Sequence, residues 1–262
     1  MRFTKRYILY LTVVLFFVAG CAGSFQKLLK GTDNEAKYEA AMKAYNEEAY
    51  HKASQLFESI LLYYRGPGKA ETVHFYYAKS LMGLKDYYNA GYQFRSFAKL
   101  FPYSPFAEEA IYLGGYCKYI ESPDYSLDQT VTRDAVQELE TYVRKFPSGE
   151  HVDKAKQMME VLKDKLIRKD YENAYNYYKI GAYQAAQTAL KQFLKDHPSS
   201  SHEEEAMYYV VKSGFSLAEN SIESKKKERF EQALKDYRQY MPLLHNDKYK
   251  NSLSAVCKQY QE

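Results

Sequence analysis

Residues 87–110, "YYNAGYQFRSFAKLFPYSPFAEEA", contain the pattern that decides the fold. Four of these residues follow one another at spacings of 3, 4 and 3, which places them on one face of an α-helix: Tyr87, Ala90, Phe94 and Phe97. Pro102 then interrupts the helix, because proline cannot continue one. Ser104 and Pro105, with two glutamates behind them, favour the start of a second helix. The stretch therefore predicts two helices joined by a short break.

The same alanine-centred pattern occurs five times along the chain. Its alanines are Ala53, Ala90, Ala135, Ala186 and Ala233, separated by 37, 45, 51 and 47 residues. The small alanine lets a neighbouring helix come close, and the large residue one turn later fills the space beyond it. Each pattern is preceded by another amphipathic stretch, at residues 38–45, 72–84, 107–119, 152–178 and 203–218. The sequence thus predicts an all-α fold, a superhelical array of about five tetratricopeptide-like helix pairs.

The breaks between pairs define the expected organisation. Prolines at 102, 147 and 198 each follow the second helix of a pair, and Ser201 with Glu204 fits a capping box at the start of the next helix. Repeats 1–3 are expected over residues 37–150. Repeats 4–5 are expected over residues 151–262, together with a capping helix near the end of the chain. An insert without helical period, residues 121–129, interrupts the third pair.

The N-terminal residues have the three parts of a secretory signal peptide. Arg2, Lys5 and Arg6 precede an apolar run of 13 residues, and small residues follow it. A membrane-spanning helix needs about 20 apolar residues, so this run is too short to be one. Residues 1–20 are therefore expected to be removed. Val18-Ala19-Gly20-Cys21 resembles the lipobox of bacterial lipoproteins, so Cys21 is predicted to be acylated, with residues 21–36 as a tether. An ordinary signal peptide followed by a free cysteine is the alternative.

Charge and cysteine content narrow the function classes. The net charge is +4, and removal of Arg2, Lys5 and Arg6 leaves +1, which gives no electrostatic case for binding nucleic acid. Cys117 and Cys257 lie 140 residues apart. They could form a disulfide in an exported protein, but units of an array contact only their neighbours, so two buried free thiols are expected.

The motifs of common enzymes and metal sites are absent from the sequence. It has no Gly-x-Ser-x-Gly elbow, no His-Glu-x-x-His and no Cys-x-x-Cys. His197 and His202 lie near three glutamates, but a proline-serine break separates the histidines, and the glutamates suit the first turn of a helix. We therefore expect neither an enzyme nor a metal or other cofactor.

Tyrosine dominates the aromatic content, with 29 residues and no tryptophan. A stack of helix pairs has a concave face formed by the first helix of each pair, which suits an extended peptide. Tyrosine provides apolar contact and a hydrogen-bonding tip there, although any one tyrosine can equally pack against the next helix.

Two segments carry a resemblance to a known family: residues 101–149, "FPYSPFAEEAIYLGGYCKYIESPDYSLDQTVTRDAVQELETYVRKFPSG", and residues 171–186, "YENAYNYYKIGAYQAA". With Cys21 and the repeats, the chain resembles the BamD family, the lipoproteins of the outer-membrane β-barrel assembly machinery. The resemblance implies a non-catalytic scaffold, tied to the outer membrane through acylated Cys21 and facing the periplasm. Its implied partners are a BamA-like barrel protein, other lipoproteins of the complex and unfolded outer-membrane proteins.

The resemblance also implies two binding surfaces. The N-terminal repeats would receive the C-terminal signal of unfolded barrel proteins, and the candidates by position are Tyr45, Tyr63, Tyr64, Tyr76, Tyr77 and Tyr112. The C-terminal repeats would hold the BamA-like protein. Relatives are thought to carry an arginine there, at a position where this chain has Ala189, so Lys191 or Lys195 would substitute. The alternative function is a periplasmic repeat adaptor that recruits cell-wall or division enzymes.

Overall fold

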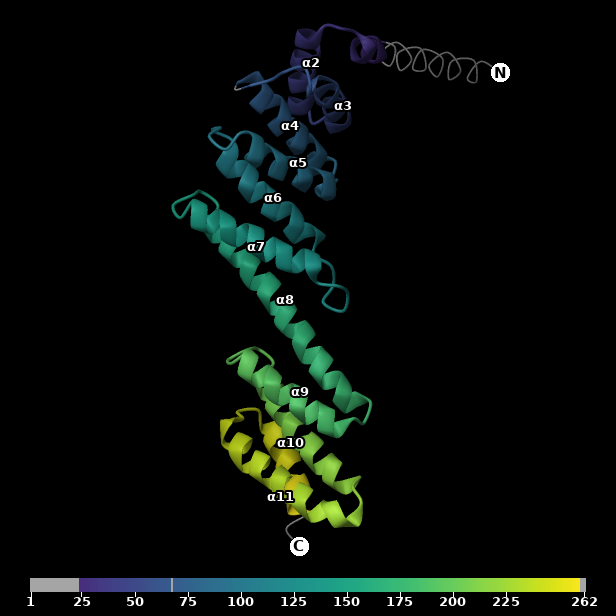
Figure 1. Cartoon of the computed structure of the whole chain (residues 1–262), viewed down its shortest axis with the longest axis vertical. Helices are drawn as coiled ribbons and strands as arrows, with labels where there is room; N and C mark the ends of the chain where they lie inside the picture. The colour runs from purple at the N-terminus through teal and green to yellow at the C-terminus, as the bar shows by residue number, and fades with distance from the viewer. Residues whose placement is uncertain (1–23, 67, 260–262) are drawn as a thin grey trace, which may run out of the picture. The chain divides into compact units, whose positions relative to one another are not determined.

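The computed structural model describes residues 24–66 and 68–259, so the predicted signal peptide and Cys21 lie outside the described residues. A helical segment at residues 24–30 precedes the elements that carry labels in Figure 1. These elements are α2 (Asn34–Asn46), α3 (Tyr50–Ile60), α4 (Lys69–Gly83), α5 (Tyr87–Leu100), α6 (Ala107–Glu121), α7 (Thr130–Lys145), α8 (Val152–Lys179), α9 (Tyr183–Asp196), α10 (Glu203–Glu219), α11 (Glu223–Tyr240), the 3-10 turn η1 (Met241–Leu243) and α12 (Asp247–Lys258). The predicted all-α array of helix pairs is confirmed.

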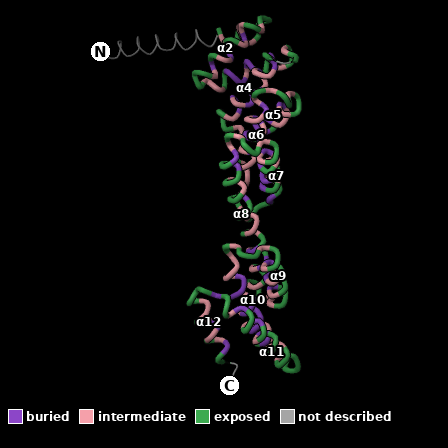
Figure 2. Tube along the Cα trace, turned by 90° about the vertical axis from the view of Figure 1, so that its left-hand side faces the viewer, coloured by how far each residue is buried: buried purple, intermediate pink, exposed green. Residues whose placement is uncertain are grey.

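The chain forms two compact units. Unit 1 holds the residues up to 122 together with 130–160, and unit 2 holds 123–129 together with the residues from 161 onward. In unit 1 α2 packs against α3, and each later helix up to α6 packs against the one that follows it, so the series ends at α7; in unit 2 α10 packs against α9, α11 and α12. Figure 2 shows buried residues along both units, as expected where each helix pair packs mainly on its neighbours.

The repeated alanines lie in the core. All five are completely buried: Ala53, Ala90, Ala135, Ala186 and Ala233. Around Ala233 the approach is so close that a Cβ added to Gly214 of α10 would lie 3.1 Å from the Ala233 Cβ. The alanine pattern therefore identified a buried position on the second helix of each predicted pair.

The predicted starts of two helices were wrong in detail. Helix α6 begins at Ala107 rather than at Pro105, and the Ser104 hydroxyl donates to Glu71 Oε2 at 2.7 Å. Glu204 does not form a capping box with Ser201. Its carboxylate instead accepts hydrogen bonds from the backbone N–H groups of His245 (3.0 Å) and Asn246 (3.1 Å). The Ser104 hydroxyl oxygen still accepts from the Phe106 backbone N–H at 3.3 Å, so a contact with a distant segment is added to the local cap at Ser104 and replaces the predicted cap at Glu204.

The insert and the cysteines behave as expected. Residues 122–129 are not helical, and Lys169 Nζ of α8 donates to the carbonyl of Leu127 at 2.6 Å and lies 3.3 Å from the carbonyls of Tyr125 and Ser126. Cys117 and Cys257 are both free and buried, one in each unit. Among the described helices, none combines the length and apolarity needed to cross a membrane.

Candidate functional site

Two of the six predicted groove tyrosines come together on the first helices of unit 1. The rings of Tyr45 on α2 and Tyr76 on α4 lie 4.8 Å apart in an edge-to-face arrangement, and Tyr50 contacts Tyr45 at 5.7 Å. All three side chains are half-buried. Burial raises the pKa of the Tyr45 phenol, despite the nearby Lys79 ammonium. We call Tyr45, Tyr50 and Tyr76 the unit 1 aromatic face.

A second pair lies in the connection after α3. Tyr63 is 63% exposed and contacts the Tyr64 ring at 5.0 Å. The Tyr64 hydroxyl lies 3.0 Å from Glu35 Oε2, and Lys69 binds the same carboxylate. Burial, followed by this hydrogen bond to Glu35, raises the pKa of Tyr64 to about 12. Tyr64 thus helps to hold the connection against α2 and exposes only part of its ring, whereas Tyr63 is free to contact a ligand.

The remaining two predicted tyrosines are core residues. Tyr77 is only 8% exposed and Tyr112 only 7%. The Tyr112 ring stacks on His151 at 4.2 Å and contacts Tyr142 at 5.5 Å, within unit 1. Both were proposed as groove residues because they lie on first helices, but they occupy the buried side of those helices. They do not line an exposed surface.

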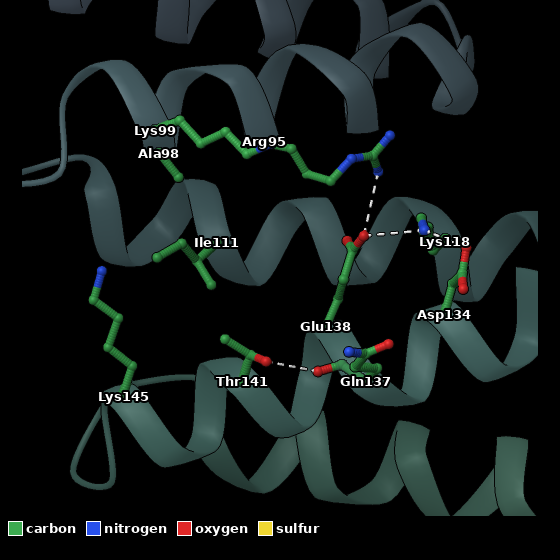
Figure 3. A pocket seen from close by; sticks show the side chains of 10 residues that line it. All are labelled: Arg95, Ala98, Lys99, Ile111, Lys118, Asp134, Gln137, Glu138, Thr141 and Lys145. Atoms are coloured by element: carbon green, nitrogen blue, oxygen red, sulfur yellow. Dashed lines mark hydrogen bonds and ion pairs between the residues drawn. The ribbon is translucent and has the colours of Figure 1, made fainter.

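A hollow of about 440 Å³ lies over α5, α6 and α7, and Figure 3 shows the side chains that line it. At one end Glu138 lies 3.1 Å from Lys118 and 3.6 Å from Arg95, and Lys118 also pairs with Asp134 at 2.8 Å. These four charges cancel. At the other end Lys99 and Lys145 are exposed on either side of Ile111. The sequence did not predict this hollow, because its acids lie on α7 and its paired cations on α5 and α6.

In unit 2 the two lysines predicted to contact a partner differ sharply. Lys191 Nζ lies 2.7 Å from Oδ2 and 2.8 Å from Oδ1 of Asp236, whose side chain is only 4% exposed. Gln187 donates to the same carboxylate at 3.0 Å. Lys191 therefore joins α9 to α11. Lys195 is exposed and forms no ion pair with the residues that the structure describes.

The outer surface of α9 has a hollow of about 920 Å³ at its N-terminal half. Exposed Tyr177 stands beside it. Small and polar side chains form much of the lining, including Ala185, Ala189 and Gln192. Ala189 thus lies in the lining of this hollow.

Sequence reasoning missed a second aromatic surface, in unit 2. Tyr175 contacts Tyr209 at 4.4 Å, and Tyr208 stacks on Tyr249 at 4.7 Å, so the rings connect α8, α10 and α12. The unit 2 tyrosine face consists of the half-buried Tyr175, Tyr178, Tyr209 and Tyr249, with Lys212 among them, and it lies on the core residue Tyr208, which is 7% exposed. Pairs of tyrosines three or four residues apart on α8 indicate it in the sequence, but their partners on α10 and α12 are distant along the chain.

The histidines considered for a metal site have other contacts. His197 Nε2 lies 3.0 Å from Asp170 Oδ2, and the His202 ring stacks on Tyr171 at 4.6 Å. Within residues 24–66 and 68–259, no group of three or more potential ligands could hold a metal ion.

Comparison with known proteins agrees with this picture. The model of the YfiO family, described as "Outer membrane lipoprotein", matches residues 30–230. The chain belongs to this family. A relative, "Outer membrane protein assembly factor BamD" of Caulobacter vibrioides, is 28% identical over 124 residues, which are 47% of this chain and 41% of that protein. The alignment thus covers less than half of the relative's length.

These findings confirm the predicted BamD family and its outer-membrane lipoprotein class. Neither description names a catalytic activity. The family match begins at residue 30 and extends over residues of both units.

Proposed function

We propose that the protein is a non-catalytic scaffold that assembles β-barrel proteins in the outer membrane, anchored there by acylated Cys21 and facing the periplasm. In this proposal the repeats within 37–150 receive unfolded barrel proteins, and those within 151–262 hold a BamA-like barrel protein and further lipoproteins of the complex. Support comes from the family, from a relative named as an assembly factor, and from the exposed aromatic surfaces.

The observation that carries the proposal is the unit 1 aromatic face. Tyr45 and Tyr76 meet edge to face at 4.8 Å while remaining half-buried, so part of each ring is open to a ligand. Tyr63, 63% exposed, adds an aromatic contact in the same unit. An extended segment that ends in an aromatic residue finds large apolar contacts and hydroxyl donors on such a surface.

Replacement of Tyr76 by alanine tests this role. Binding of a peptide with the C-terminal strand of an outer-membrane barrel protein should weaken by about 30-fold, the equivalent of roughly 2 kcal/mol at a hot spot. Tyr88→Ala is the matched control, since Tyr88 is 71% exposed on α5. Tyr76 also contacts the Phe106 ring at 6.3 Å, so the melting temperature of each variant must be measured. Equal affinity of folded Tyr76→Ala and wild-type protein would remove this face from the substrate site.

For the BamA-like partner, we propose the outer surface of α9. Lys195 is exposed there and Ala189 lines the 920 Å³ hollow, whereas Lys191 is occupied by Asp236. Lys195→Glu should reduce copurification of the barrel partner from detergent-solubilised outer membranes, and Lys235→Glu, at an exposed position on α11, is the control. Recovery of cell-wall enzymes in place of a barrel protein by the wild-type chain would favour the adaptor function instead.

A further inference from the structure

The structure describes the chain from Ser24 onward, three residues after the cysteine that is predicted to be acylated. A helical segment, residues 24–30, begins there. Three residues span at most about 11 Å even when they are fully extended. With acylated Cys21 as proposed above, the start of this segment lies within about one Debye length of the lipid headgroups.

The helical segment separates charged from apolar side chains. Lys27 and Lys30 are exposed and lie three residues apart, so they share one face of the segment. Phe25, Leu28 and Leu29 are half-buried. Neither lysine forms an ion pair with a residue in the described ranges of the chain. Two cations are therefore available at a point of the chain that the anchor keeps close to lipid.

The connection between α3 and α4 lies at the same end of unit 1. The Tyr64 hydroxyl lies 3.3 Å from the Asn34 carbonyl oxygen and 3.0 Å from Glu35 Oε2, and Lys69 binds the Glu35 carboxylate. These contacts hold the connection on the first turn of α2. Only residues 31–33 separate α2 from the helical segment, so the segment, the start of α2 and the connection share one end of the unit (Figure 1).

This end of unit 1 exposes both a large apolar side chain and an excess of positive charge. Leu62 is 86% exposed, and Arg65 is exposed without an ion pair to any described residue. Residues 24–35 and 61–69 contain four basic and two acidic side chains, a net charge of +2, and one of the two acids is already bound by Lys69. Apolar side chains among cations suit a membrane surface, where the apolar group enters the interface and the cations meet anionic lipid phosphates.

We propose that the N-terminal end of unit 1 docks on a lipid bilayer that contains anionic headgroups. Lys27, Lys30 and Arg65 bind the headgroup phosphates, and Leu62 enters the headgroup region. A bilayer fits better than a second protein, because the anchor places this end next to lipid before any partner arrives. Docking rests on the acylation of Cys21 proposed above, and it adds a defined orientation of unit 1 at the membrane.

Quenching of a fluorophore by labelled lipid tests the docking surface in the full acylated chain. Leu62→Cys is labelled with a bimane, while Cys117 and Cys257 are buried and so remain unlabelled. Leu100→Cys is the matched control, since Leu100 is 58% exposed on α5. Both proteins are reconstituted into phosphatidylcholine vesicles, with or without phosphatidylglycerol, that carry a lipid with a nitroxide on its headgroup. We expect quenching at residue 62 that increases with phosphatidylglycerol, and little quenching at residue 100.

Charge variants identify the cations. In vesicles with phosphatidylglycerol, each of Lys27→Gln, Lys30→Gln and Arg65→Gln should lower the ratio of docked to undocked protein by about fivefold. Lys99→Gln, at an exposed position on α5, should leave this ratio unchanged. Sodium chloride should weaken quenching of the labelled protein with its native charges, which tests the electrostatic contribution without a charge variant. Tyr63 stays unchanged in every variant, because it belongs to the proposed substrate contact.

The outcomes separate docking from the proposed function. Equal quenching at residues 62 and 100, or equal quenching at residue 62 with and without phosphatidylglycerol, overturns the docking surface but leaves the anchor and the unit 1 aromatic face in place. Mass spectrometry of the N-terminal peptide measures the anchor independently, and a Cys21 without acyl chains overturns the anchor and the docking together. Quenching that depends on phosphatidylglycerol, combined with unchanged peptide affinity of Tyr76→Ala, supports docking and refutes only the substrate role.

Discussion

Replacement of Lys191 by methionine should destabilise unit 2, because it leaves a buried carboxylate without its cation. The Lys191 ammonium lies 2.7 Å and 2.8 Å from the two oxygens of Asp236. The side chain of Asp236 is 4% exposed and that of Lys191 is 33% exposed. Methionine keeps most of the length and apolar contact of lysine, so the substitution mainly removes the charge.

The magnitude follows from the remaining partners of Asp236. At an effective dielectric constant of about 20, two unit charges about 3 Å apart attract by roughly 5 kcal/mol before desolvation is subtracted. Removal of one partner from a fully buried pair costs about 3–5 kcal/mol. Here Gln187 still donates to Asp236 at 3.0 Å, and Lys191 is partly solvated. We therefore expect Lys191→Met to lower the free energy of unfolding of unit 2 by about 2 kcal/mol.

Hydrogen exchange of the α9 and α11 peptides measures this loss directly, since the two units need not unfold together. Asp236→Asn should cost less, about 1 kcal/mol, because Lys191 can turn into solvent. The double variant should be more stable than the sum of the single effects predicts. Lys195→Met, at an exposed site on α9, should change exchange by less than about 0.5 kcal/mol. Equal exchange in Lys191→Met and wild-type protein would refute the assignment of Lys191 to an internal ion pair.

Three further predictions concern packing, burial and acid stability. Gly214→Ala should lower the free energy of unfolding of unit 2 by about 1–3 kcal/mol, because the new Cβ would lie 3.1 Å from that of Ala233; unchanged hydrogen exchange in α10 would contradict this. Burial raises the pKa of the Cys117 thiol to about 12, so the reactive thiolate is scarce at pH 8 in the folded protein. Cys117 should therefore react with Ellman's reagent at pH 8 only after unfolding. The hydrogen bond from Lys69 holds the pKa of Glu35 below its ordinary value of 4.5. Above pH 4.5 the urea concentration at the midpoint of unfolding should therefore be higher for wild-type protein than for the Glu35→Gln variant. The difference in urea midpoint should disappear as the pH falls through the lowered pKa of Glu35. A difference that stays constant down to pH 3 would contradict the stabilising role of the Glu35 carboxylate.

The fold could be predicted because each repeat carries its own local signal. An alanine with large residues four and seven positions after it marks the buried face of a helix, and Ala53 and Ala135 are both completely buried as this requires. The prolines at 102, 147 and 198 mark the breaks between successive helix pairs. The helix starts were less predictable: Glu204 has the local spacing of a capping residue, but its carboxylate is used by His245 and Asn246, about 40 residues later.

The candidate site was harder to predict than the fold, because a helix position does not reveal which side of the helix is covered. Tyr76 and Tyr77 are adjacent on α4, yet Tyr76 is half-buried and Tyr77 is in the core. Lys191 and Lys195 lie one turn apart on α9, yet only Lys191 meets a buried acid. That acid, Asp236, is 45 residues away, and no local pattern connects the two.

The partners of the tyrosine hydroxyls separate structural tyrosines from candidate binding residues. Tyr142 is completely buried, and its hydroxyl accepts from the His151 backbone N–H at 3.1 Å and lies 3.2 Å from Glu108. Such a residue has no donor left for a ligand. On the unit 2 tyrosine face, Tyr175 and Tyr209 bond to each other at 3.2 Å while remaining half-buried. Phenylalanine would pack equally well at these places but would leave no hydroxyl at the surface, and leucine would give less rigid contact area. Tyrosine therefore closes the core with hydrogen-bonded tips at some positions and leaves half-buried rings with hydroxyl groups at others.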